Sequence, residues 1–130
     1  KPEGQVVTIE PGVPFQIGDC TVHPFSVPHG HVVVTAFRIG SLGYVTDAKS
    51  VPESAIALLR GVKVLVVNAL FRTAHPTHLS ISDAVAVARD VGAGRTFLTH
   101  LTHENFHADL EAELPAGIAP AFDGLTVRVE

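Results

Sequence analysis

The sequence has 130 residues, of which 46% are hydrophobic and 17% are charged, a composition that excludes a disordered chain and favours one domain with one core. Nine Lys and Arg residues against 13 Asp and Glu residues give a net charge of −4, so nucleic acid is not an expected partner. The apolar runs are far shorter than the ~18 residues of a membrane span, which excludes a membrane-embedded chain.

The first part of the chain is predicted to form a β-meander. Five short segments are rich in valine and bounded by Gly, Pro or Asp, as strands and tight turns require. These segments cover residues 5–9, 15–17, 20–27, 32–39 and 42–46.

The second part alternates between predicted helices and strands. A short helix over 55–60 has Ser50 as its expected N-cap, Pro52 in its first turn and Gly61 as its stop, and an apolar strand follows over 62–67. Ser80 and Asp83 form a capping box for the next helix.

That helix is expected to end at Gly92, because glycine readily takes the left-handed conformation that closes a helix. A strand over 95–99 and a helix over 104–114 come next. Two short segments, 119–122 and 125–129, flank Asp123-Gly124, a pair typical of a hairpin turn. The whole pattern predicts an α/β domain over 1–130, with a mixed sheet and helices on one of its faces.

Three polar side chains stand where predicted strands end: His29, Asp47 and His100. In open α/β sheets ligands bind at strand ends, where loops gather side chains from distant parts of the chain. Two imidazoles and a carboxylate at one sheet edge would suit zinc, manganese or iron. The loop before the second helix holds His75 and His78, which could reach the same edge.

Each of these residues also has an ordinary structural interpretation. A single loop histidine is most often a solvated surface residue, and Asp47 could serve only as a turn or cap residue. His23, inside a strand, and His107, on an exposed helix face, are assigned structural roles. The sequence has no phosphate-binding glycine loop, no nucleophile elbow and no Cys-x-x-Cys pair that would indicate a competing chemistry.

Four segments, 44–47 (Tyr-Val-Thr-Asp), 75–80 (His-Pro-Thr-His-Leu-Ser), 98–103 (Leu-Thr-His-Leu-Thr-His) and 121–125 (Ala-Phe-Asp-Gly-Leu), carry a resemblance to a known family. In this order they resemble the C-terminal half of the metallo-β-lactamase-fold hydrolases, nearest to the branch of the cyclic-phosphate phosphodiesterase of phosphonate metabolism. The resemblance spans essentially the whole chain. It implies one half of an αββα sandwich that holds two divalent metal ions, zinc first and manganese or iron as alternatives.

The resemblance also implies a role for each candidate residue. His29 resembles the ligand of the first metal, Asp47 the bridge between the metals, and His100 the ligand of the second. His78 resembles a histidine that is not a ligand and assists the leaving group. The implied activity is hydrolysis of a small phosphodiester-like substrate by a metal-bridging hydroxide.

The family's His-x-His-x-Asp-His motif does not occur in this sequence. We therefore expect a fragment that lacks the N-terminal half, is inactive alone, holds metal poorly, and either self-associates or contacts the missing half. The absence of methionine agrees with this expectation, and the single cysteine, Cys20, favours a reducing, cytoplasmic location. Asn68 stands where the family commonly has aspartate, which could weaken a contact behind the metal ligands. The rival hypothesis is a non-catalytic binding or assembly domain with little or no metal.

Overall fold

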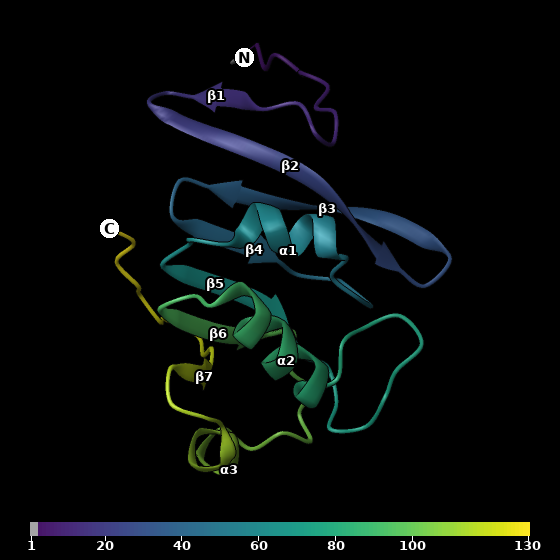
Figure 1. The fold of residues 1–130 in the computed structure, drawn as a ribbon, viewed down its shortest axis with the longest axis vertical. Coiled ribbons are helices and arrows are strands. Elements are labelled where there is room, and N and C mark those ends of the chain that lie inside the picture. The colour runs from purple at the N-terminus through teal and green to yellow at the C-terminus, as the bar shows by residue number, and fades with distance from the viewer. Residues whose placement is uncertain (1–2) are drawn as a thin grey trace.

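The computed structural model describes residues 3–130, which form a seven-stranded mixed sheet and three helices (Figure 1). The elements, in chain order, are β1 (Phe15–Ile17), β2 (Cys20–His29), β3 (Val32–Ile39), β4 (Leu42–Val45), α1 (Glu53–Leu59), β5 (Val64–Asn68), α2 (Ile81–Val91), β6 (Arg95–Thr99), α3 (His107–Glu113) and β7 (Ile118–Pro120). The fifth strand starts later than predicted, and α3 is shorter than predicted at both ends. No helix among residues 3–130 is both long and apolar enough to cross a bilayer.

The strands lie side by side in sequence order, from β1 to β7. Strands β1 to β4 pair antiparallel as the predicted meander, and β4 to β7 pair parallel. Because β2 and β4 are both antiparallel to β3, they run in the same direction as each other and as β5 and β6. The carboxyl ends of β2, β4, β5 and β6 therefore meet at one edge of the sheet.

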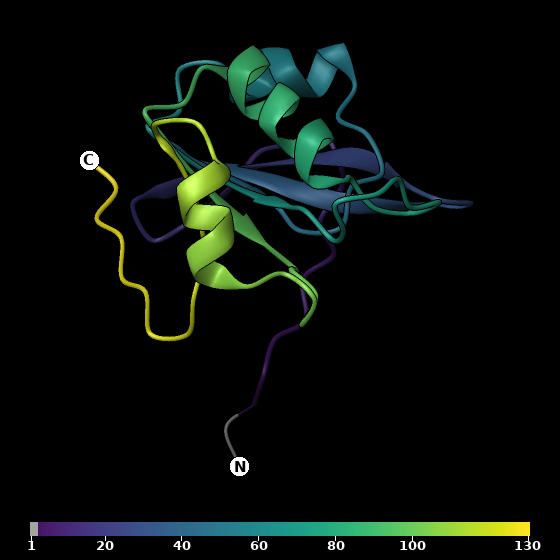
Figure 2. The same cartoon turned by 90° about the horizontal axis from the view of Figure 1, so that it is seen from below.

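Helices α1 and α2 cover one face of the sheet (Figure 2). Alternate residues of the strands point toward these helices and form the core, in which Leu59, Leu65, Val67 and Leu98 have no exposed surface. Burial of one such side chain contributes roughly 1.5–3 kcal/mol to folding. The core thus fixes the sheet edge on which the strand-end residues stand.

Among residues 3–130, no helix covers the opposite face of the sheet. The C-terminal segment crosses part of it, so that Leu125, Val127 and Val129 line a pocket with apolar residues of β4, β5 and β6. Tyr44 remains 44% exposed there, and Val33, at the start of β3, is 66% exposed. The prediction that helices would cover only one face is therefore confirmed.

Two predicted strands are wrong. Residues 5–9 pair with no other strand, and Val6 is 95% exposed; without a neighbour to pack against, valine content alone does not make a strand. The predicted hairpin over 119–129 is also absent. The turn at Asp123-Gly124 does form, with Leu125 N–H donating to the carbonyl of Phe122 at 3.0 Å, but β7 pairs with β6 and residues 125–129 stay unpaired.

The helix ends follow the predicted chemistry in one case and depart from it in another. The capping box of α2 is confirmed, since the side chains of Ser80 and Asp83 each accept from the other's backbone N–H, and Gly92 ends the helix with φ +70°. Ser50 does not cap α1. Pro52 stands at that position without a side-chain hydrogen bond, because its fixed φ already suits entry into a helix.

Cys20 begins β2 and is exposed. It lies at the end of that strand opposite to His29. The ten residues of β2 therefore connect the thiol to the sheet edge described next.

Candidate metal centre

Four side chains from separate parts of the chain gather at the edge where the parallel-running strands end. His29 is the last residue of β2, Asp47 follows β4, and His100 directly follows β6. His78 comes from the loop between β5 and α2, which folds back toward the β2–β3 turn (Figure 1). The structure thus brings together all four residues singled out from the sequence.

The polar atoms of these side chains face one another at short distances. Asp47 Oδ1 lies 3.6 Å from Nε2 of His78 and 3.7 Å from Nε2 of His100. One ligand atom from each of His29, Asp47 and His78 lies within 4.8 Å of the others. The ring of His78 stands in the middle, with its centroid 4.6 Å from that of His29 and 4.7 Å from that of His100.

This donor set fits a divalent transition metal. Neutral imidazole nitrogens and a carboxylate oxygen are the ligands that zinc, manganese and iron take in proteins. The side chain of His78 is 12% exposed, whereas those of Asp47 and His100 are 40% and 44% exposed. The cluster therefore has a closed inner side and an outer side open to a ligand.

The backbone is strained at one member of the cluster. His100 has φ +61° and is the one non-glycine residue with positive φ in the described part of the chain. The left-handed conformation costs about 1–2 kcal/mol for a residue with a Cβ atom. Such strain concentrates at functional sites, and here it turns the chain so that the imidazole faces Asp47.

Asn68 anchors the loop that carries Asp47. Its side chain is fully buried, its Oδ1 accepts from Ala48 N–H at 2.8 Å, and its Nδ2 donates to the carbonyl of Ala48 at 2.9 Å. The hydroxyl of Thr46 donates to Asp47 Oδ2 at 2.9 Å. The amide thus holds both backbone groups of Ala48.

Asn68→Asp is expected to destabilise the protein by about 1–3 kcal/mol, because a carboxylate cannot donate to the carbonyl of Ala48 and would be buried beside it. Chemical denaturation measures this loss. Asn105→Asp is the matched control, since it removes a similar bond to the carbonyl of Leu70 at a partly exposed position and should cost less. Equal midpoints for wild type and Asn68→Asp would refute the anchoring role.

Burial lowers the pKa of His78 below its ordinary value of 6.5, and the neighbouring His100 and His29 lower it further, against the opposing effect of its contact with Asp47. The unfolded chain therefore takes up a proton more readily than the folded chain as the pH falls below about 6.5. The free energy of unfolding of the metal-free protein should then decrease over that range. In His78→Gln the decrease should be shallower than in wild type. Parallel curves for His78→Gln and wild type would contradict this expectation.

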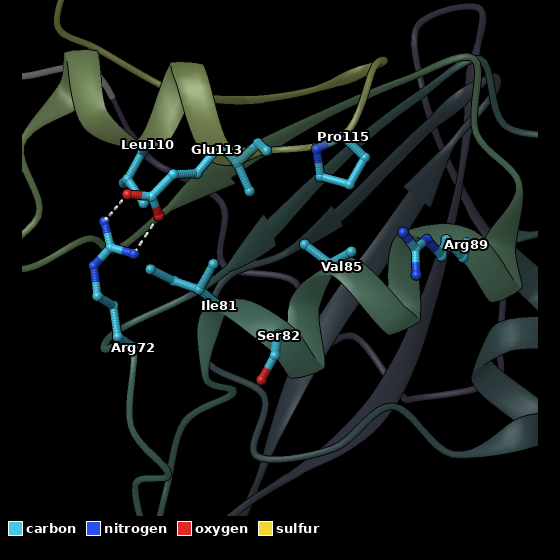
Figure 3. Close-up of a pocket in the computed structure, with 9 residues that line it drawn as sticks. Arg72, Ile81, Ser82, Val85, Arg89, Leu110, Glu113 and Pro115 are labelled. Atoms are coloured by element: carbon cyan, nitrogen blue, oxygen red, sulfur yellow. Dashed lines mark hydrogen bonds and ion pairs between the residues drawn. The ribbon is translucent and has the colours of Figure 1, made fainter.

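Two pockets help to delimit the site. One of about 320 Å³ opens beside His100 and is lined by Thr99, Leu101, Phe122 and Asp123. Another, of about 370 Å³, separates α2 from α3 and is bordered by the ion pair of Arg72 and Glu113 (Figure 3). The second pocket contains no member of the histidine cluster, whereas the first offers a ligand space next to it.

Sequence reasoning did not single out Thr77. Its carbonyl oxygen lies 2.8 Å from His29 Nδ1, and its hydroxyl lies 2.9 Å from His78 Nδ1 and 3.2 Å from His75 Nδ1. The ring of His75 is 5.3 Å from that of His78, so His75 borders the cluster without facing Asp47. The only available signal was that Thr77 lies between two histidines.

Comparison with known proteins finds one relative by sequence and several solved structures with a similar fold. A Porphyromonas gingivalis octanoyltransferase is 32% identical over 127 residues, which are 94% of this chain and 25% of that protein. The crystal structure of a new diphosphatase from the PhnP family has a TM-score of 0.88 and 34% identity, and covers 92% of this chain and 47% of its own. The zinc-bound PqqB from Methylobacterium extorquens has a TM-score of 0.73 and 20% identity, and covers 95% of this chain and 55% of its own. The chain thus spans a quarter to about half of the length of these proteins.

A family model supports the same assignment. The model of the beta-lactamase superfamily domain matches residues 1–101, which contain β1 to β6 and end directly after His100. The mixed sheet and the helices match the architecture of the PhnP-family diphosphatase. The chain is therefore a member of the beta-lactamase superfamily and has the metallo-β-lactamase fold.

Proposed function

We propose that this chain is the C-terminal half of a metal-dependent hydrolase that cleaves phosphodiester or related phosphoryl bonds. The observation that carries the proposal is the cluster of three histidines and one aspartate at the edge of the sheet. The 34% identity to a diphosphatase of the PhnP family supports a phosphoryl substrate. The pocket beside His100 supplies space for a small molecule.

In this proposal His29, Asp47 and His100 hold two divalent ions, with zinc favoured by the imidazole-rich donor set and manganese or iron as alternatives. Bound ions would act as Lewis acids on the phosphoryl group and supply a nucleophile from water at neutral pH. Asp47 contributes the one negative charge of the cluster and would be shared between the ions. His78, which is less exposed than His100, would act in its imidazolium form and donate a proton to the leaving oxygen.

The remaining ligands are proposed to come from a part of the intact protein outside this sequence. Each ion would otherwise have one histidine and a shared carboxylate, fewer than the three protein ligands of catalytic zinc sites. That part would also cover the sheet face that carries Tyr44. We further propose that the intact protein works in the cytoplasm, where an exposed thiol such as Cys20 stays reduced.

The test uses the intact protein that contains this chain. It is freed of metal, loaded with zinc or manganese, and offered a chromogenic aryl phosphodiester, an aryl phosphomonoester and a chromogenic β-lactam. Cleavage of the diester that is lost on chelation and restored by metal supports the proposal. A fully metal-loaded protein that leaves the diester intact would refute it, and cleavage of the lactam alone would move the site to a different substrate class.

A non-catalytic binding or assembly domain is the second candidate. It is favoured by the match to only 25% of an octanoyltransferase, so that the matched segment is a small part of a longer chain. Elemental analysis of the purified intact protein separates the two candidates. Less than one metal ion per chain after loading supports the second candidate, and close to two ions supports the hydrolase.

The isolated 130-residue chain is expected to self-associate through its uncovered sheet face. An apolar face of this kind is an interaction surface, and a stable contact buries well above ~1,000 Å² in total. Sedimentation should therefore show dimers or larger species. Tyr44→Lys, on that face, should shift the chain toward monomer, whereas Leu58→Lys, which is similarly exposed on α1, should not. A wild-type monomer at high concentration would exclude this contact.

A further inference from the structure

Thr77 contacts three imidazoles through three different groups. Its carbonyl oxygen faces His29 Nδ1 at 2.8 Å, and its hydroxyl faces His78 Nδ1 at 2.9 Å. Its backbone N–H donates to His75 Nδ1 at 3.3 Å. No other residue in the described part of the chain forms hydrogen bonds with three histidines, so Thr77 connects the β2 end of the cluster with the β5–α2 loop.

A glycine lets this loop approach β2. Gly30, in the turn after His29, has φ +63°, and a Cβ atom added to it would lie 2.6 Å from Thr77 Cγ2. Only a residue without a side chain leaves room for Thr77 at this position. The contact between the Thr77 carbonyl and His29 therefore depends on the glycine that follows the histidine.

The carbonyl fixes the proton of His29. A carbonyl oxygen only accepts hydrogen bonds, so Nδ1 of His29 must carry the hydrogen. In the neutral ring Nε2 is then left with a free lone pair, which is the form that binds a metal. The backbone of Thr77 thus prepares His29 as an Nε2 ligand.

The Thr77 hydroxyl contacts ring nitrogens of both His75 and His78 and has a single hydrogen to donate. Because His75 Nδ1 already accepts the backbone N–H of Thr77, we assign that hydrogen to the shorter contact, with His78 Nδ1. Neutral His78 then carries its hydrogen on Nε2. This hydrogen also satisfies the 3.1 Å contact between His78 Nε2 and His100 Nε2, which needs one donor and one lone pair. His100 Nε2 keeps its lone pair as a result.

We infer that Thr77 is a positioning residue that sets the protonation pattern of the cluster: lone pairs at Nε2 of His29 and His100, and a hydrogen at Nε2 of His78. The pattern distinguishes the two proposed metal ligands, His29 and His100, from His78, the proposed proton donor. Its catalytic meaning rests on the proposed function, but the pattern itself does not.

The test is the ¹⁵N spectrum of the histidine rings in the metal-free 130-residue chain, at a pH where the imidazoles are neutral. Long-range ¹H–¹⁵N correlations report which nitrogen of each ring carries the hydrogen. In wild type and Thr77→Ser, His29 should be protonated at Nδ1 and His78 at Nε2. In Thr77→Val, which keeps the shape and removes the hydroxyl, His78 should become a mixture of both forms while His29 stays unchanged. Wild-type His78 protonated at Nδ1, or a Thr77→Val spectrum identical to wild type, would overturn the inference.

The zinc affinity of the intact protein, measured by competition with a chelating indicator, gives a second readout. Gly30→Ala should displace the Thr77 carbonyl and weaken zinc binding by about 10-fold or more, as for other lost partners of metal-ligating histidines. Thr77→Val should bind zinc as wild type does, because the bond to His29 uses the backbone. Zinc affinity that falls equally in both variants would mean that Thr77 only supports the loop, and the inference would fail.

In the intact protein, Thr77→Val should lower kcat for the diester by about 10–100-fold with KM unchanged, and Thr77→Ser should restore it. An unaltered kcat in Thr77→Val would overturn the positioning role in catalysis. A wild-type protein without diester cleavage but with the expected ring protonation would refute the proposed function alone. The two failures are therefore distinguishable.

Discussion

Replacing Asp47 with asparagine is expected to abolish phosphodiester cleavage by the intact protein. Asp47 Oδ1 is within 3.7 Å of two imidazoles, and the carboxylate is the one anionic group among the four clustered side chains. An amide of the same shape lacks the negative charge needed between two dications. The loss of turnover should exceed the ~10–100-fold loss that follows from replacing a residue that hydrogen-bonds to a metal ligand. Metal content, measured by elemental analysis, should fall together with turnover.

Asp90→Asn is the matched control for this variant. Asp90 lies on the exposed side of α2, and its conversion to an amide changes the net charge by the same amount. Both variants should fold, as judged by thermal denaturation. Normal metal content and turnover in Asp47→Asn would contradict the proposed bridging role of Asp47.

Replacing His78 with alanine is expected to lower turnover by about 10²–10⁴-fold, the usual contribution of a general acid. Metal content should stay close to wild type, because His29, Asp47 and His100 remain. The effect should be largest for substrates with poor leaving groups, since a good leaving group departs without a proton. An activated aryl diester and an alkyl diester compared in the same assay measure this difference.

His75→Ala tests the specificity of this role, because His75 neighbours His78 but faces Thr77 instead of Asp47. It should reduce turnover less than His78→Ala does. Loss of metal in His78→Ala would instead identify His78 as a metal ligand. One ligand atom each of His29, Asp47 and His78 lies within 4.8 Å of the others, so the geometry is compatible with that result. That outcome would also contradict the ring protonation inferred from Thr77.

The sheet edge that carries the site can be predicted from the sequence because the residues that mark the ends of its strands lie next to those strands in the chain. Gly, Pro and Asp mark the turns of the meander, and each apolar run between them is long enough for one strand. The alternation of helices and strands after β4 favours parallel pairing, because a helix supplies the crossover that parallel strands need. The strand ends at His29, Asp47 and His100 are therefore predicted from the sequence to share one edge.

The parts that sequence reasoning did not reach depend on contacts distant along the chain. Residues 125–129 alternate apolar and polar side chains as a strand does, yet their apolar side packs on the sheet and their backbone has no strand partner. Whether such a segment pairs is decided by its neighbours. Likewise Asn68 and Thr77 act through hydrogen bonds to Ala48 and His29, which lie 20 and 48 residues away in sequence.

The position of Cys20 allows the distance between a spin label and the histidine cluster to be measured. The only thiol of the chain is exposed at the first residue of β2, and His29 is the last residue of the same strand. Nine steps along a strand of ~3.3 Å each separate the two backbones by roughly 30 Å. A nitroxide attached to Cys20 and a paramagnetic Mn²⁺ ion at the histidine cluster would lie at a separation that pulsed electron spin resonance resolves. Metal occupancy could thus be read as a distance along one rigid strand, without introducing or removing any cysteine.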